Sequence, residues 1–169
     1  MNVLLRPGTD ADLLAVGVLH DRSRATAYAH ILDAENLSGP SAEALGEWWS
    51  ERWKWEKDTH RLTIADEEGE VVGFTYVGPS ETDGAAELYA IHVEPRLVGS
   101  GVGHWLMVNA LDQLAGLGAE RAVLWVLAAN DHARRFYERG GWQPDGATRT
   151  EAVSGQPVPQ LRYSLSLAG

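Results

Sequence analysis

The chain has 169 residues, of which 44% are hydrophobic, and its formal net charge is −10. The length and the hydrophobic fraction favour one globular domain over residues 1–169, with a sizeable core. The acidic balance excludes broad nucleic-acid binding, which needs a basic face, and the absence of cysteine excludes disulfides and zinc–thiolate sites.

The first third of the chain predicts one strand and two capped helices. The apolar run of residues 2–6 is closed by proline and glycine, which is typical of a strand end. Thr9 is a helix N-cap type, and two aspartates follow it where the helix dipole favours carboxylates. We expect that helix to end near residues 28–30. Residues 38–40, Ser-Gly-Pro, then interrupt the chain before a second helix over residues 41–57, capped by its first serine.

The rest of the chain predicts a mixed α/β pattern. Apolar runs predict strands, and apolar residues at helical spacing predict helices. The expected strands are residues 61–66, 71–77, 86–93 and 121–127, with two more between 142 and 167. The expected helices are residues 102–115 and 130–139. The order β-α-α-β-β-β-α-β-α-β-β indicates an α/β domain with a mixed sheet, largely antiparallel at the front, and a ligand crevice at the central β-α-β unit.

The segment EPRLVGSGVGHWL, residues 94–106, places Gly99, Gly101 and Gly103 between a predicted strand and a predicted helix. Glycine lets backbone amides approach an anion closely, and a helix N-terminus favours negative charge. A P-loop needs Lys-Ser or Lys-Thr after its last glycine, and a dinucleotide fingerprint needs G-x-G-x-x-G, so neither fits. A pyrophosphate cradle and a glycine-rich packing turn remain as alternatives.

A second segment, NDHARRFYERGGW at residues 130–142, follows the other strand of the β-α-β unit. Together the two segments resemble the signatures of the GNAT superfamily, the acetyl-CoA-dependent N-acetyltransferases, and the order of elements resembles that fold. The first signature matches at Val93, Pro95, Gly99, Gly101 and Gly103. The second matches at Asn130, Ala133, Phe136, Tyr137 and Gly141, with Trp142 in the aromatic place. One departure is Val98, where the family has Gln or Arg; Arg96 lies two residues earlier.

The resemblance implies acetyl-CoA as co-substrate and assigns residues to hold it. The strand end Ile91, His92 and Val93 would offer its backbone to the pantetheine arm and the thioester carbonyl. The loop amides would bind the pyrophosphate, namely those of Val98, Gly99, Ser100, Gly101, Val102, Gly103 and His104. Asn130 would hydrogen-bond the pantetheine chain, in addition to capping a helix.

Acetyl transfer to an amine needs a proton acceptor and a donor for the departing thiolate. Tyr137 is the candidate general acid; its alternative role is that of a core tyrosine beside Phe136. Glu87 is the candidate general base; its alternative is a solvated strand residue or the partner of an arginine. In a regular strand Glu87 and Ile91 share a face, but a β-bulge, which is usual there in the family, would break that parity.

Four tryptophans crowd the second predicted helix: Trp48, Trp49, Trp53 and Trp55. Two interpretations stay open for them. They could pack the core, or they could form an aromatic wall for the acceptor, where a cation–π contact would hold an ammonium group.

The sequence thus predicts an N-acetyltransferase that acts directly, without a cysteinyl intermediate, on a primary amine of a small molecule. An amino acid, an amino-acid-like toxin and a polyamine are the expected acceptors. Acetylation of protein N-termini or lysines and non-catalytic acyl-CoA binding are the alternatives. No metal is expected, because the histidines lack ligand spacing. No membrane span or signal peptide is evident, so we expect a cytoplasmic protein, and the resemblance allows a homodimer.

Overall fold

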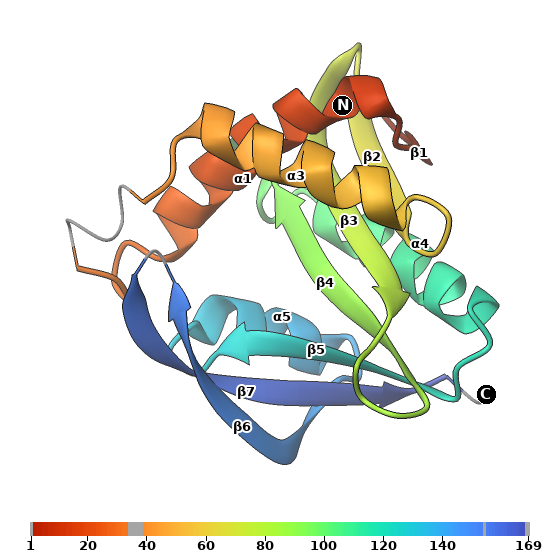
Figure 1. The fold of residues 1–169 in the computed structure, drawn as a ribbon, viewed down its shortest axis with the longest axis vertical. Coiled ribbons are helices and arrows are strands. Elements are labelled where there is room, and N and C mark those ends of the chain that lie inside the picture. The colour runs from red at the N-terminus through yellow and green to blue at the C-terminus, as the bar shows by residue number, and fades with distance from the viewer. Residues whose placement is uncertain (1, 34–38, 154, 168–169) are drawn as a thin grey trace.

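The computed structural model describes residues 2–33, 39–153 and 155–167. Its seven strands form one sheet in the order β1-β2-β3-β4-β5-β7-β6 (Figure 1). Every neighbouring pair is antiparallel except β4 and β5, which are parallel. The predicted mixed sheet and the predicted order of elements are confirmed. The expected chain break at Ser38 lies outside the described residues.

The elements differ from the predicted ones by only a few residues at their ends. The strands are β1 (Val3–Pro7), β2 (Arg61–Glu67), β3 (Glu70–Pro79), β4 (Ala85–Val93), β5 (Arg121–Leu127), β6 (Gln143–Val153) and β7 (Gln156–Ser166). The helices are α1 (Leu13–Ala27), α3 (Ala42–Glu56), α4 (Val102–Gly116) and α5 (Asp131–Arg139), with short 3-10 turns at η1 (Asp10–Asp12) and η2 (Pro95–Leu97). Among the described residues, no helix combines the length and the apolar character needed to cross a membrane.

Polar side chains fix where the helices begin. Thr9, Ser41 and Asn130 each accept a hydrogen bond from a backbone amide two or three residues later. Such caps satisfy amides that have no partner inside the helix, and each contributes about 1 kcal/mol. The predicted caps at Thr9 and Ser41 are therefore confirmed, although Thr9 caps η1, which leads into α1.

Helices cover both faces of the sheet (Figure 1). α1 and α3 pack Leu13, Val16 and Trp49 against Phe74 and Tyr76 on one face. α4 packs on the other face, where α5 joins the same core through partly buried side chains. The central strands are therefore covered by α1 and α3 on one face and by α4 and α5 on the other.

α1 and α3 cross closely because both carry glycine at the contact. A Cβ on Gly17 would lie 2.3 Å from the backbone nitrogen of Gly46, too close for any side chain. This packing holds α3 against the sheet beside β4, and so it fixes the position of the α3 side chains near the candidate site.

The two parallel strands separate soon after they begin. β4 pairs with β5 only at Ala85↔Arg121, Ala86↔Ala122 and Glu87↔Val123. Beyond Glu87 the strands diverge toward their C-terminal ends (Figure 1). The edge of β4 that faces β5 therefore has no strand partner over residues 88–93, which leaves backbone groups available to a ligand.

β4 also contains a bulge. Tyr76 pairs with Ala90 and Val77 pairs with Leu88, so Tyr89 is an extra residue in β4. An extra residue shifts the alternation of side chains by one position. The side chains before and after Tyr89 consequently do not follow the parity of a regular strand.

Candidate active site

The loop between β4 and α4 presents backbone amides to solvent. The amides of Val98 and Ser100 donate to the carbonyls of Pro95 at 3.3 Å and Leu97 at 3.0 Å. Five further amides find no hydrogen-bond acceptor in the part of the chain that the structure describes: those of Gly99, Gly101, Val102, Gly103 and His104. These amides surround the N-terminus of α4, whose first turn carries no acidic side chain. The arrangement suits an anion such as a pyrophosphate.

Two glycines of this loop have backbone conformations that favour glycine. Gly99 and Gly101 have φ angles of 85° and 104°, which side-chain-bearing residues rarely adopt. A Cβ added to either would meet no atom within 4 Å, so the space above the loop is open. A Cβ on Gly103 would make ordinary contacts, 3.5 Å from Phe136 and 3.7 Å from Val93. Packing does not demand a glycine at position 103, which favours an anion cradle over a packing turn.

Side chains add little positive charge to this loop. Val98, which occupies the family's Gln or Arg position, is apolar and 53% exposed. Arg96 pairs with Glu67 of β2 at 2.5 Å, so it does not complete the cradle from two residues earlier. His104 is exposed in the first turn of α4. An anion bound at this loop would therefore meet backbone amides and the dipole of α4.

The open edge of β4 offers alternate residues to a ligand. The amide of Glu94 donates to the carbonyl of Val72 on β3 at 2.8 Å. Alternation in an antiparallel pair then directs the backbone of His92 toward β3 and the backbones of Ile91 and Val93 toward the open edge. Ile91 and Val93 fit the predicted backbone role, whereas His92 offers neither its amide nor its carbonyl on that edge.

α5 places Asn130 and Tyr137 beyond the C-terminal end of β5. The Asn130 Oδ1 accepts the amide of Ala133 at 3.2 Å, so the capping role is confirmed. Its side-chain NH₂ has no hydrogen-bond acceptor among the described residues, which leaves it available to a ligand. The two roles considered for Asn130 are therefore compatible.

Tyr137 is enclosed by aromatic rings and keeps its proton. Its ring centroid lies 5.7 Å from that of Phe136, 6.4 Å from Trp142 and 6.3 Å from Tyr163. Burial raises the pKa of Tyr137, and the nearby Tyr28 phenol adds to the rise. No described residue hydrogen-bonds the Tyr137 hydroxyl. The phenol is thus a protonated donor without a protein partner, which is compatible with a role toward a departing thiolate.

Glu87 is the last residue of β4 that pairs with β5. Its carboxylate accepts a hydrogen bond from the Ser80 hydroxyl at 2.7 Å and forms no ion pair with any described residue. Burial raises the pKa of Glu87 above its ordinary 4.5, while Ser80, Arg149 and Arg52 oppose the rise. A half-buried carboxyl with a raised pKa at the start of a strand divergence is typical of a functional group rather than a solvated strand residue.

The bulge at Tyr89 decides which face Glu87 occupies. Ala86 and Leu88 pack into the core below α4, so Glu87 between them faces α1 and α3. Tyr89 and Ala90 pack on the α1 and α3 side, and Ile91 returns to the α4 side. Glu87 and Ile91 therefore lie on opposite faces, as the alternative with a bulge predicts.

α1 supplies polar groups to this same face, and sequence reasoning missed them. The ring centroids of His20 and His92 are 4.7 Å apart. Trp49 donates its indole N–H to His20 Nδ1 at 3.0 Å. His92 Nδ1 lies 2.9 Å from the Ser23 hydroxyl. Burial lowers the pKa of His20 to about 4 and holds the pKa of His92 well below 6.5. Both rings are neutral at physiological pH.

Helical spacing in the sequence indicates that these polar residues of α1 share one face. His20, Arg24 and Tyr28 recur every four residues on the face of α1 that also carries Leu13 and Val16. Arg24 is 4% exposed and pairs with Asp21 at 3.1 Å. Polar residues that continue an apolar stripe indicate a helix end that faces a polar site.

The tryptophans of α3 differ in burial. Trp49 is 2% exposed and lies 5.5 Å from Phe74 in the core, whereas Trp48 is 50% exposed. The guanidinium of Arg52 lies 5.6 Å from the Trp48 ring and 4.6 Å from the Tyr89 ring. The protein's own Arg52 thus occupies the cation–π position that was considered for a substrate ammonium.

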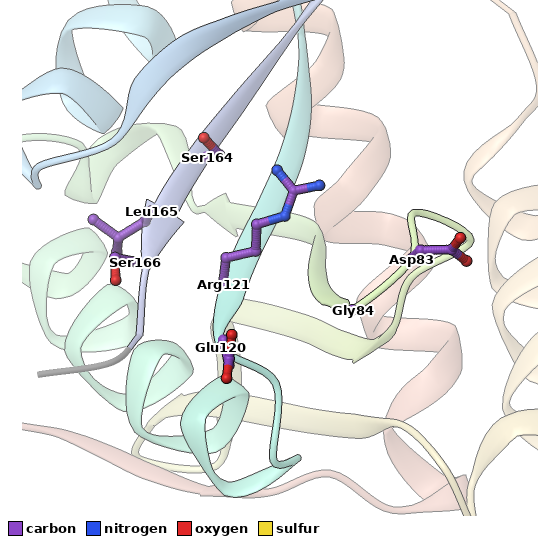
Figure 2. A pocket seen from close by; sticks show the side chains of 7 residues that line it. All are labelled: Asp83, Gly84, Glu120, Arg121, Ser164, Leu165 and Ser166. Carbon is purple, nitrogen blue, oxygen red and sulfur yellow. The ribbon is translucent and has the colours of Figure 1, made fainter.

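Two surface hollows differ in whether they lie near the candidate site residues. A hollow of about 280 Å³ is lined by side chains of α3, including Trp48, Arg52 and Trp55. A larger one of about 490 Å³ lies at the paired end of β4 and β5, beside Arg121 and Ser164 (Figure 2). It contains none of the predicted site residues. Arg52 connects the hollow along α3 with Tyr89, because its side chain lines the hollow and its guanidinium lies over the Tyr89 ring.

Residues 27–142, more than half of the chain, match a family model described as the acetyltransferase (GNAT) family. The chain belongs to this family. Its similarity extends to a mycothiol acetyltransferase of Streptomyces bingchenggensis, with 32% identity over 151 residues, covering 86% of this chain and 44% of that protein. The chain therefore spans less than half the length of this curated relative.

Solved structures share the fold across the whole length. PaiA N-acetyltransferase from Thermoplasma acidophilum, in complex with coenzyme A, gives a TM-score of 0.73 at 17% identity, covering 98% of this chain and 99% of that one. YncA from Salmonella typhimurium, with acetyl-CoA, gives 0.72 at 20% identity, covering 99% and 95%. At these identities the likeness establishes the fold.

Proposed function

We propose that the chain transfers the acetyl group of acetyl-CoA directly to a primary amine of a small molecule, with both substrates bound together. The observation that carries the proposal is the divergence of β4 and β5 beyond Glu87. Because of this divergence, three groups follow one another along the chain: the Glu87 carboxyl, the open edge of β4, and the N-terminus of α4 with its free amides. The family, and relatives solved with coenzyme A or acetyl-CoA, support the same co-substrate.

The residues present suit acetyl-CoA in three places. The amides of Gly99 and of residues 101–104 would bind the pyrophosphate, with no acidic side chain in the first turn of α4 to oppose it. Ile91 and Val93 would bond the pantetheine arm in the way a neighbouring strand would. The Asn130 NH₂ would bond the same arm from α5. The amides of Val98 and Ser100 are already bonded, which leaves these two residues a role as loop spacers.

Glu87 would accept a proton from the acceptor ammonium, directly or through a water molecule. Burial raises its pKa, which makes it a better proton acceptor than an ordinary carboxylate. Open backbone amides on β4 would stabilise negative charge on the thioester oxygen. Attack on the thioester needs this neutral amine held in line with the carbonyl.

Tyr137 would donate a hydrogen bond to the departing sulfur. Its pKa is raised, so the phenol is a weaker acid than a coenzyme A thiol with a pKa of about 8.5. Complete proton transfer from Tyr137 to the thiolate is therefore uphill. Stabilisation of the sulfur by a shared proton, followed by protonation from solvent, is the role that this environment supports.

Release of free thiol from acetyl-CoA tests the proposal against its alternatives. We expect release that depends on small primary amines, with the acetylated amine as the product. Release with peptides alone would indicate an acetyltransferase of protein N-termini or lysines. Tight coenzyme A binding without release on any amine would indicate a non-catalytic binding module. Incubation with acetyl-CoA alone should leave the mass of the protein unchanged, because direct transfer forms no acetyl-enzyme.

A further inference from the structure

Aromatic rings and guanidinium groups surround Glu87 on its own face of the sheet. Glu87 pairs with Val123 of β5, and Trp125 lies two residues further along β5. Side chains two residues apart share a face of a strand, so Trp125 lies on the same face as Glu87. Tyr89 lies on this face from the β4 side. An amine that is to give a proton to Glu87 would reach it on the face that carries these rings.

A guanidinium lies over each of the two rings. The Cζ atom of Arg149, from β6, is 4.2 Å from the centroid of Trp125. The Cζ atom of Arg52, from α3, is 4.6 Å from the centroid of Tyr89. Both guanidinium groups act on the Glu87 carboxyl and lower its pKa against the effect of burial. Positive charge thus flanks the candidate base from the β4 side and from the β5 side.

The arginines near Glu87 differ in how closely a carboxylate of the protein pairs with each of them. Arg52 pairs with Glu56 at 2.5 Å. Arg162, which also lies over Trp125 at 5.9 Å, pairs with Asp145 at 2.7 Å. Each of these charges is compensated inside the protein by a close carboxylate.

Arg149 has weaker compensation. Its acid partner is Glu151 at 3.5 Å, and the Glu151 side chain is 55% exposed. Its Nε donates to the buried amide oxygen of Gln160 at 2.6 Å, a neutral acceptor. The contact with the Trp125 ring and the bond to Gln160 hold the guanidinium in place. A planar guanidinium with a fixed orientation is the preferred partner of a carboxylate, which it binds through two N–H groups.

We propose that the amine acceptor is a zwitterion of the amino-acid class, whose carboxylate binds Arg149 on Trp125 while its amine faces Glu87. This inference rests on the acetyl transfer proposed above and makes Arg149 a specificity-determining residue. A polyamine is disfavoured, because a second ammonium group would meet Arg149 or Arg52 instead of a free carboxylate.

Matched acceptors test the inference. Each proteinogenic amino acid is compared with its amide and with the amine left by removing its carboxyl group, and spermidine is added to the panel. The amide has a less basic amine than the amino acid, and the decarboxylated compound has a more basic one. A preference over both therefore reports the carboxylate and not the basicity of the amine.

We expect the preferred amino acid to exceed both analogues about tenfold or more in kcat/KM, mainly through a lower KM, because hydrogen bonds to charged groups have that strength. Equal or better turnover of the analogues or of spermidine would overturn the inference and leave acetyl transfer standing. Absence of thiol release with every amine would overturn both.

The substitution Arg149→Gln should remove the preference for the carboxylate, measured as the ratio of kcat/KM for the amino acid to that for its amide, and leave the KM for acetyl-CoA within about threefold. Arg149→Lys should restore part of the preference, since it keeps the charge and loses the planar fork. Arg61→Gln is the matched control, because it makes the same charge change at an exposed position of β2. A preference that survives Arg149→Gln and disappears in Arg162→Gln would overturn the assignment.

Binding without turnover gives an independent readout. In the presence of coenzyme A, the preferred amino acid should raise the melting temperature of the wild-type protein more than its amide does. Arg149→Gln should abolish the difference between the two compounds while the melting temperature of the unliganded variant stays close to that of the wild type. An unchanged difference in the variant would count against Arg149.

Discussion

The two sides of β4 are built in different ways. On the α4 side, the proposed anion cradle consists of backbone amides within residues 99–104. On the α1 and α3 side, the proposed acceptor face consists of side chains from α1, α3, β4, β5 and β6, namely His20, Arg52, Glu87, Tyr89, Trp125 and Arg149. Backbone amides do not titrate and need no rotamer to be fixed. Side chains can discriminate between acceptors, but their burial costs free energy and shifts their pKa values.

The largest expected effect is at Glu87, on the acceptor face. Glu87→Gln should lower kcat about 100- to 1000-fold, in the range of general base catalysis, and leave the affinity for coenzyme A unchanged. The amide keeps the size of the carboxyl and can still accept the hydrogen bond of Ser80. Steady-state kinetics and calorimetric titration with coenzyme A measure the two quantities. A parallel loss of coenzyme A affinity would place Glu87 in the cradle instead.

The pH profile sharpens the same prediction. The pKa of Glu87 is raised by burial, so activity should fall as the pH drops through a value above 4.5, where the carboxylate becomes protonated. The residual activity of Glu87→Gln should lack this acidic limb. An identical limb in the variant would show that another group titrates there.

The buried histidines make stability depend on pH on the acceptor side. The pKa of His20 is about 4, against 6.5 for the ordinary side chain. The unfolded state therefore binds the proton first, so the stability that His20 contributes is complete above pH 6.5 and is lost as the pH falls toward 4. At about 1.4 kcal/mol per pKa unit, the loss is about 3 kcal/mol.

Urea unfolding between pH 7 and pH 4 measures this loss. His20→Asn should flatten the dependence, because asparagine can accept the Trp49 indole N–H and does not titrate. His104→Asn is the matched control, since it makes the same substitution at an exposed position at the start of α4. An unaltered slope in His20→Asn would mean that His20 is not the titrating group.

Tyr137 packs on the α4 side of the sheet, and its expected effect is smaller. Tyr137→Phe removes only the hydroxyl, so the ring contacts with Phe136 and Trp142 should persist. We expect kcat to fall about 10- to 100-fold, because one hydrogen bond to the charged sulfur is worth about 1.5–3 kcal/mol. With the same amine, an acetyl thioester whose thiol is more acidic than that of coenzyme A should show a smaller loss of kcat. An equal loss with both thioesters would indicate a structural role.

The difference in construction explains what could be predicted from the sequence. The order of elements, the caps at Thr9 and Ser41 and the glycine loop each depend on local chemistry, and the structure agrees with them. The face of Glu87 depended on the bulge at Tyr89, which is a pairing of β4 with β3 and has no local sequence signal.

The acceptor face illustrates the same limit. Arg149 approaches Trp125 only because β6, β7 and β5 are neighbours in the sheet. His92 was expected to offer its backbone to the cofactor, but the register with β3 turns that backbone away from the open edge. Side chains far apart in the sequence meet through the sheet order, which a single sequence does not reveal.

The smallest expected effect tests whether the cradle depends on backbone direction alone. Gly101→Ala and Gly69→Ala form a matched pair, because their φ angles are 104° and 93° and a Cβ on either meets no atom within 4 Å. Each should cost about 1–2 kcal/mol of stability, the strain of a side chain in a left-handed conformation. Gly69 lies in the turn between β2 and β3, away from the cradle.

Gly101→Ala alone should weaken coenzyme A binding, by about tenfold, because relief of the strain rotates the neighbouring amides away from the anion. Calorimetric titration with coenzyme A and with its dephosphorylated pantetheine portion separates the causes. The weakening should be present with coenzyme A and absent with pantetheine, which carries no pyrophosphate. Equal weakening with both ligands, or weakening in Gly69→Ala as well, would show that strain acts through general loosening of the fold and not through the amides of this loop.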